Sequence, residues 1–235
     1  MSFFTDKFLG SDFFNNIEFD HIEFYSGNAK QSAYYYQNTF GFDLIAYRGP
    51  ETEKTDTVSY VLNKNKIYFV ITSPLKSNNN ISDWILKHGD GVYNIAFKVD
   101  SVNDAYEGCL QRGAIPNSND TVKDNKFGFY EEASIKSYGD CIHTFVNRNN
   151  YKGFWAPGFK KLNYKNKGAD SHIILIDHIV ANVELEKMDF WKEYYENIFG
   201  FSAFVRFDET DISTKYSSLK SVVVRSENWK VKLPI

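Results

Sequence analysis

Residues 19–42 read FDHIEFYSGNAKQSAYYYQNTFGF, and residues 176–201 read IDHIVANVELEKMDFWKEYYENIFGF, which is the same pattern with two residues inserted. Both segments begin with an Asp-His-Ile triplet, carry paired tyrosines and an asparagine further along, and close on Phe-Gly-Phe. Self-similarity over this length indicates a structural unit that the chain repeats.

Each copy begins with an apolar run of strand length. Aromatic and apolar residues at helical spacing follow, such as Phe190, Tyr194 and Ile198 in the second copy. Gly41 and Gly200 stand where a left-handed residue would end the helix. Further strands are expected at 57–62 and 67–72 in the first copy, and at 219–225 and 229–233 in the second. The repeated unit is therefore predicted to be βαβββ.

A third, more diverged copy begins with HGDGVYNIAFKVDSVNDAYEGCLQRGA, residues 88–114. We expect a strand at 92–99, a helix at 102–111 that ends near Gly113, and a closing strand at 141–147. This copy and the first make two units in a row.

Three segments follow from the repeats. Residues 1–150 are predicted to form a complete N-terminal domain of two units. Residues 151–174, with Pro157 and Gly158 among scattered lysines and asparagines, are predicted to be a linker. Residues 175–235 then hold the first unit of an incomplete C-terminal domain.

Composition narrows the class of protein. The chain has 27 Lys and Arg against 30 Asp and Glu and shows no basic run, so nucleic acid is not an expected partner. No apolar stretch reaches the length of a membrane span, and the first ten residues lack the pattern of a signal peptide. Cys109 and Cys141 lie far apart and are expected to be buried free thiols. We therefore expect a soluble, cytoplasmic protein.

Six segments carry a family pattern over nearly the whole chain: FDHIEFYSGNAKQSAYYYQNTFGF with AYRG after it, HGDGVYNIAFKVD, KSYGDCIHTFVNR, NNYKGFWAPGF, IDHIVANV and LKSVVVRSENWKVKLPI. In this order they resemble the 4-hydroxyphenylpyruvate dioxygenase family of the vicinal oxygen chelate superfamily. The resemblance implies an α+β fold of paired βαβββ modules, with a complete N-terminal domain and half of the C-terminal domain.

The resemblance also implies a ferrous iron held by two histidines and one glutamate in the C-terminal domain. His178 in IDHIVANV matches the first histidine ligand. Strand alternation puts His178, Val180 and Asn182 on one face, so Val180 is expected to face the substrate with His178. Ser221 in LKSVVV matches a serine near the substrate pocket. Without the family, a lone strand histidine is more often a packing residue, and a serine inside a strand is about as often a packing residue as a site residue.

The N-terminal domain, by the same comparison, is expected to hold no metal. His21 matches the first ligand, but Asn94 and Thr144 stand where a second histidine and a glutamate would be. His21 is then structural. His88, His143 and His172 are expected to be surface or packing residues.

The implied activity converts 4-hydroxyphenylpyruvate and O2 to homogentisate and CO2 in tyrosine and phenylalanine catabolism, and the substrate supplies its own 2-oxo acid. The second histidine and the glutamate are expected beyond residue 235, so this chain is expected to be truncated and inactive alone. Its exposed apolar face, at Val180, Val183 and Val223, predicts a homodimer or higher homo-oligomer, or local disorder after about residue 200.

Two alternatives stay open at this point. 4-Hydroxymandelate synthase shares the fold, the metal and the substrate but oxidises the benzylic carbon. A non-catalytic binding or assembly protein that has lost the iron site would also carry a single ligand histidine. Downstream coding sequence with a further histidine and glutamate would favour an enzyme.

Overall fold

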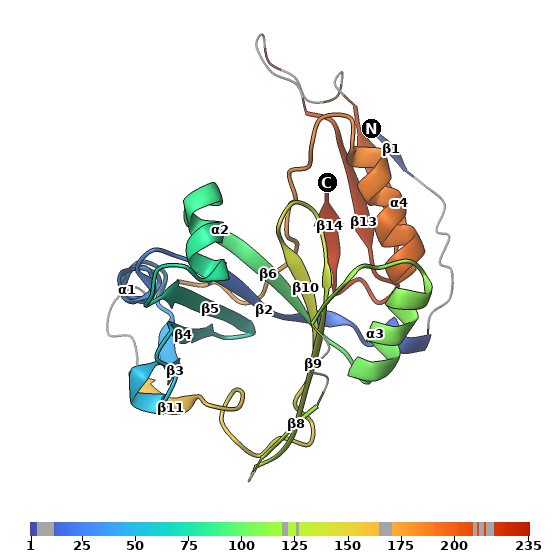
Figure 1. Cartoon of the computed structure of the whole chain (residues 1–235). Helices are drawn as coiled ribbons and strands as arrows, with labels where there is room; N and C mark the ends of the chain where they lie inside the picture. Colours follow the sequence, from blue (N-terminus) through green and yellow to red (C-terminus); the bar gives the residue numbers. More distant parts are fainter. Residues whose placement is uncertain are drawn as a thin grey trace.

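The computed structural model describes residues 1–3, 12–118, 122–125, 127–164, 171–208, 211, 214 and 219–235. In this part of the chain, a 10-stranded mixed sheet and a 4-stranded sheet carry helices packed against them (Figure 1). The α+β class and the repeated module are confirmed.

The first unit contains β2 (Glu18–Tyr25), α1 (Ala29–Phe40), β3 (Asp43–Arg48), a 3-10 turn (Pro50–Thr52), β4 (Thr57–Lys64) and β5 (Ile67–Pro74). The side chain of Asn28 accepts the Gln31 amide and starts α1, and Gly41 ends it with a left-handed φ of 74°. The unit closes on itself because β5 returns parallel to β2.

The second unit contains β6 (Gly91–Lys98), α3 (Val102–Gln111), β7 (Pro116–Ser118), β8 (Val122–Asn125), β9 (Gly128–Lys136) and β10 (Ile142–Asn147). Strand β10 lies parallel to β6, as β5 does to β2. The two units meet where β2 and β6 pair antiparallel, with Glu23 opposite Asn94. Helix α2 (Asn80–His88) connects them and has no counterpart in the predicted pattern.

The third unit contains α4 (Met188–Phe199), β12 (Ser202–Phe207), β13 (Ser221–Arg225) and β14 (Lys232–Pro234), and β1 (Ser2–Phe3) adds to the edge at β12. Its first strand is incomplete. The Ile179 amide donates to the Lys232 carbonyl at 3.2 Å, and the Ala181 amide donates to the Pro234 carbonyl at 2.9 Å, which is a parallel register. Pro234 has no amide hydrogen to donate back, so no regular ladder forms.

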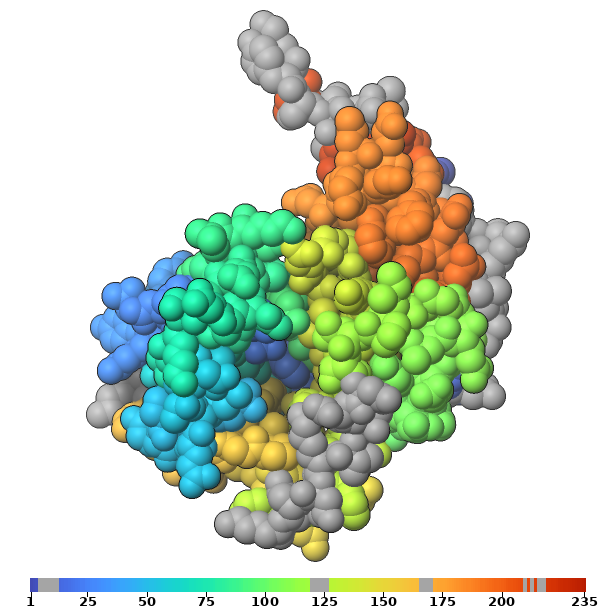
Figure 2. Space-filling view, in the orientation of Figure 1, coloured from blue at the N-terminus to red at the C-terminus, as the bar shows by residue number. Residues whose placement is uncertain are grey.

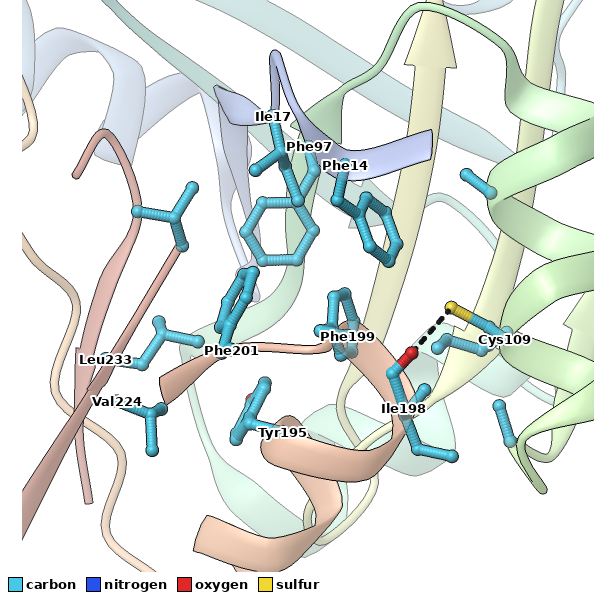
Figure 3. Packing of buried hydrophobic residues seen from close by; sticks show 14 of the residues in the cluster. Phe14, Ile17, Phe97, Cys109, Tyr195, Ile198, Phe199, Phe201, Val224 and Leu233 are labelled. Atoms are coloured by element: carbon cyan, nitrogen blue, oxygen red, sulfur yellow. Dashed lines mark hydrogen bonds between the residues drawn. The ribbon is translucent and has the colours of Figure 1, made fainter. Parts of the chain in front are cut away.

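The second and third units share one core, whereas the first unit buries a separate cluster of its own, made of Ala29, Ala33, Phe42, Leu62, Ile67 and Ile71. Phe199 of α4 stacks on Phe14 with ring centroids 5.2 Å apart, and it also touches Phe97 of β6 and Phe145 of β10. Figure 3 shows the rings of Phe14, Phe97 and Phe199 together with Val224 and Leu233 of the third unit. Apolar burial at this junction is the main force that ties residues 188–235 to the N-terminal units.

Two expectations for the third unit need correction. Val183 is not on the exposed face, because it packs against the shared core with Ile179. The described residues after 200 are also not free of structure, since β12, β13 and β14 form one sheet. Residues 209–210, 212–213 and 215–218 lie outside the described part of the chain.

The segment expected to be a linker contributes to the first sheet. Strand β11 (Lys160–Tyr164) pairs antiparallel with β3. Just before it, Trp155 and Phe159 pack against buried residues of both N-terminal units. The reason is the aromatic content of FWAPGF, which favours burial over a solvated connection. Residues 165–170 of the expected linker are outside the described part.

None of the helices in the described ranges combines the length and the apolar character needed to span a bilayer.

Candidate functional site

His178 lies on the open face of the segment that runs beside β14. Ala181 is 5% exposed and Ile179 packs against the shared core, whereas Val180 is 59% exposed. His178 and Asn182 are exposed with Val180. The alternation expected from the sequence is therefore present, and it puts His178 and Val180 on the face away from α4.

Asp177 holds the His178 ring from one side. Nδ1 of His178 lies 2.9 Å from Oδ2 of Asp177, while Oδ1 of the same carboxylate accepts Lys232 Nζ. A carboxylate beside Nδ1 favours the tautomer with hydrogen on Nδ1 and a lone pair on Nε2. The hydrogen bonds to Lys232 and His178 lower the pKa of Asp177. The carboxylate is 61% exposed, so water screens these contacts.

Ser221 begins β13 and is 7% exposed. The alternate residues Val222 and Val224 point into the shared core, so Ser221, Val223 and Arg225 belong to the other face of this sheet. Arg225 is almost fully buried, and its guanidinium lies 3.7 Å from the Trp229 ring centroid. No sequence pattern predicted this stacked pair, because Arg225 and Trp229 form no known spacing pattern.

The structure does not bring the predicted site residues into one cavity. His178 lines an apolar pocket of about 370 Å³ between α1 and residues 173–178, with Phe40, Phe42 and Phe69 on its other side. Neither Val180 nor Ser221 lines that pocket. Their assignment to a common site with His178 stays a prediction.

The equivalent positions of the N-terminal units do meet. His21, Asn94 and Thr144 all line one cavity of about 620 Å³, inside the curl of the large sheet. Each is less than one-tenth exposed. These are the three positions that the family resemblance matches to a ligand set, and in this structure they line the same cavity.

Asp20 fixes His21 as Asp177 fixes His178, but in a buried setting. Nδ1 of His21 lies 2.6 Å from Oδ1 of Asp20, and Arg148 donates to the other carboxylate oxygen. Burial alone would raise the pKa of Asp20, but the charges of Arg148 and His21 outweigh it and hold that pKa well below 3.8. Trp155 closes this group, with its ring edge-on to His21 and its carbonyl accepting from Arg148.

Arg148 and Trp155 were not predicted as site residues. Their positions in KSYGDCIHTFVNR and NNYKGFWAPGF were visible, but no spacing rule connects either of them to residue 20. Only the return of the chain after β10 brings them to the same place.

The residues described do not fit a complete iron site. No group of three or more His, Cys, Asp or Glu side chains in the described ranges could hold a metal ion. At the C-terminal position only His178 and its neighbour Asp177 supply donors, and Asp177 is already engaged by Lys232. One imidazole gives neither the number nor the geometry of ligands that selects Fe(II).

The other histidines serve packing or surface roles. His143 of β10 is fully buried, and its Nδ1 lies 3.2 Å from the Ile95 carbonyl, which can only accept. Nε2 is therefore the acceptor, and two hydroxyls lie within hydrogen-bond distance of it, that of Tyr195 in α4 at 2.7 Å and that of Ser137 at 3.0 Å. Burial lowers the pKa of His143 to about 4. His88 pairs with Asp140, and His172 is exposed.

The sequence matches known proteins over almost all its length. Residues 18–134 match the family described as Glyoxalase/Bleomycin resistance protein/Dioxygenase superfamily. A 4-hydroxyphenylpyruvate dioxygenase from Dictyostelium discoideum is 39% identical over 92% of this chain and 61% of its own length. The enzyme of the same name from Coccidioides posadasii is 36% identical over 92% of this chain and 59% of its own length. The one from Danio rerio is 35% identical over 100% of this chain and 61% of its own length. The chain thus spans about three-fifths of these relatives.

Solved structures share the fold. A mutant of 4-hydroxymandelate synthase from Streptomyces coelicolor superposes with a TM-score of 0.80, at 20% identity, over 92% of this chain and 61% of that one. A xylose isomerase-like TIM barrel/4-hydroxyphenylpyruvate dioxygenase fusion protein gives 0.68 at 15% identity, over 92% and 31%. At these identities the likeness concerns the architecture alone.

Proposed function

The chain belongs to the glyoxalase/bleomycin resistance protein/dioxygenase superfamily and, within it, to the 4-hydroxyphenylpyruvate dioxygenases, and from this membership we propose its activity. We propose that it forms the N-terminal three-fifths of an enzyme that converts 4-hydroxyphenylpyruvate and O2 to homogentisate and CO2. The observation that carries the proposal is the match at 35–39% identity, which runs through all three βαβββ units.

The proposed role of His178 is to hold Fe(II), which supplies the dioxygen chemistry when bound. The contact between Asp177 and Nδ1 supports this role, because it leaves the lone pair of Nε2 on an exposed ring. Val180 shares the face of His178, and Ser221 lies on the corresponding face of β13. We propose both as substrate contacts.

Two further properties are part of the proposal. The exposed Val180, together with Trp229 at 48% exposed, supports association through the open face of the third sheet, including a homo-oligomer. Cys109 and Cys141 are both free thiols, which supports a reducing, cytoplasmic location.

The 235 residues alone are proposed to be inactive and to bind iron weakly. Anaerobic titration of this polypeptide with Fe(II), followed by calorimetry, should show no stoichiometric tight site. A tight one-to-one site would overturn this part of the proposal.

The activity is tested on a polypeptide that includes the coding sequence downstream of residue 235. Homogentisate should form from 4-hydroxyphenylpyruvate with uptake of O2, and His178→Ala should abolish both iron retention and product. His172→Ala, an exposed histidine six residues earlier, is the matched control and should retain both. Formation of hydroxymandelate, or full activity of His178→Ala, would contradict the proposal.

A further inference from the structure

The cavity between the first two units has no part in the proposed reaction. It measures about 620 Å³, within the range of small-molecule sites, and it is enclosed by β2, β6, β9, β10 and residues 155–159. In Figure 2 the dark-blue atoms of β2 are visible deep between the cyan-green segments and the yellow-green ones. The depth of β2 there shows that this face of the molecule is hollowed.

Arg48 places an uncompensated positive charge on the cavity wall. In the described residues no carboxylate lies within ion-pair distance of its guanidinium, and its buried Nε has no hydrogen-bond partner. Its guanidinium carbon lies 4.6 Å from the Phe159 ring centroid, which holds it in place. Lys54, the other cation lining the cavity, is already paired with Asp56 at 3.0 Å. Arg48 is therefore the cation available to an anionic group.

The start of α2 adds a second positive end, in a cavity that is also lined by the carboxylates of Glu23, Asp56 and Glu132. Asn79, Asn80 and Ile81 line the cavity, and α2 begins at Asn80. The first amides of a helix carry partial positive charge, and this charge favours an anion nearby.

Another part of the cavity lining, in contrast, offers hydrogen-bond acceptors on Asn94 and Glu23. Asn94 is 4% exposed, and its buried Oδ1 has no hydrogen-bond partner. A buried acceptor without a donor costs free energy until a donor reaches it. Glu23 also lines the cavity, where it accepts the Thr72 hydroxyl at 2.7 Å and keeps further acceptor capacity.

The walls between the two ends are aromatic. The rings of Tyr25 and Tyr93 stack with centroids 4.0 Å apart, and Tyr130, Trp155 and Phe159 also line the cavity. Burial and the nearby Glu23 raise the pKa of Tyr25, so its hydroxyl stays protonated and can donate. Flat apolar walls of this kind suit an aromatic ring.

We propose that this cavity is a second binding site, for a small aromatic carboxylic acid that carries a hydroxyl or amino donor. Its carboxylate binds Arg48, its ring lies among the tyrosines and Trp155, and its donor meets Asn94 and Glu23. The site is separate from His178 and does not depend on the proposed dioxygenase activity.

The test is calorimetric titration of the 235-residue chain with 4-hydroxyphenylacetate, which has the carboxylate, the ring and the hydroxyl. We expect a dissociation constant on the order of 1 mM or tighter. 4-Hydroxyphenylethanol, which lacks only the carboxylate, should bind about tenfold more weakly or worse.

Variants locate the binding. Arg48→Gln should weaken binding of 4-hydroxyphenylacetate about tenfold, and Asn94→Leu should also weaken it. Because the two variants change opposite ends of the proposed site, the test still holds if one of them folds poorly. Arg206→Gln, a matched arginine in the third unit, and His178→Ala should leave it unchanged. Circular dichroism checks the fold of each. Absence of binding, equal binding of the alcohol, or loss of binding in His178→Ala with none in Arg48→Gln would overturn the proposal.

Discussion

The same two residues, Asp-His, open the first and the third unit, and the structure puts them in opposite surroundings. Asp20 and His21 have side chains 8% and 9% exposed, with Arg148 and Trp155 closing over them. Asp177 and His178 are 61% and 50% exposed and share only Lys232. The Nδ1–carboxylate contact is common to both pairs. A local sequence can thus fix the contact between neighbours, while the neighbouring unit decides whether it is buried.

The largest expected effect separates the two aspartates. Asp20→Asn leaves Arg148 without its buried partner and should lower the free energy of unfolding by about 3–5 kcal/mol. Asp177→Asn removes an exposed contact and should cost at most about 1 kcal/mol. Urea denaturation measures both. Equal losses would show that burial does not distinguish the two pairs.

Acid should weaken the junction between the N-terminal units and α4. In the unfolded state His143 binds a proton near pH 6.5, whereas burial lowers its pKa in the folded state to about 4. The free energy of unfolding is therefore at its full value above pH 6.5 and decreases as the pH falls toward 4. The loss should reach about 3 kcal/mol.

His143→Gln should flatten the pH dependence of the free energy of unfolding between pH 4 and 6.5. Between pH 7 and 9 the slope of this free energy with pH should match that of the wild type. Denaturant melts across this range provide the measurement. Below about pH 4 the protonation of Asp20 adds a separate loss. An unchanged slope between pH 6.5 and 4 in the variant would rule out His143 as the cause.

The hydrogen bond across the same junction should have a smaller effect. Tyr195→Phe removes the nearer of the two hydroxyls beside Nε2 of His143, the other being that of Ser137, and should cost about 1–2 kcal/mol. Tyr194→Phe, the neighbouring residue, loses a more exposed bond to the Lys136 carbonyl and should cost less than about 0.5 kcal/mol. Thermal melts at pH 7 compare them. If Tyr194→Phe lowered the free energy of unfolding more than Tyr195→Phe, the Tyr194 hydrogen bond would be the one that stabilises the position of α4.

The smallest effect concerns the incomplete strand at His178. Pro234→Ala supplies an amide hydrogen that can donate to residue 179 and extend the ladder. Hydrogen exchange of the Ile179 and Ala181 amides should slow a few-fold, with unfolding free energy changed by less than about 1 kcal/mol. Faster exchange in the variant would indicate that this segment is not paired in parallel with β14.

Sequence patterns predicted the elements that carry strong local signals. Helix 102–111 and the strands of the first unit match closely, and Gly200 ends α4 with a left-handed φ of 69°, as its position predicted. Helix α2 and strand β11 were missed because their stability comes from packing. Strand β11, for example, has only Leu162 and Tyr164 in alternation, which is too short a pattern to predict a strand, and it is held by β3.

The candidate site divides in the same way. The family resemblance matched His21, Asn94 and Thr144 to the positions of one ligand set, and these three residues line a common cavity. It could not predict Arg148 over Asp20, or the uncompensated Arg48 in the cavity. Long-range pairs such as Asp20 and Arg148 are 128 residues apart and have no periodic signal.

The sequence by itself determined the repeated unit, its strand and helix order, the faces on which residues alternate, and the family to which the chain belongs. These follow from local periodicity and from similarity between segments. The tertiary structure alone decided that the second and third units share one core, that one Asp-His pair is buried and the other open, and that Arg48 remains without an ion-pair partner among the described residues. Burial and charge compensation depend on which distant segments meet, and that is a property of the packed chain.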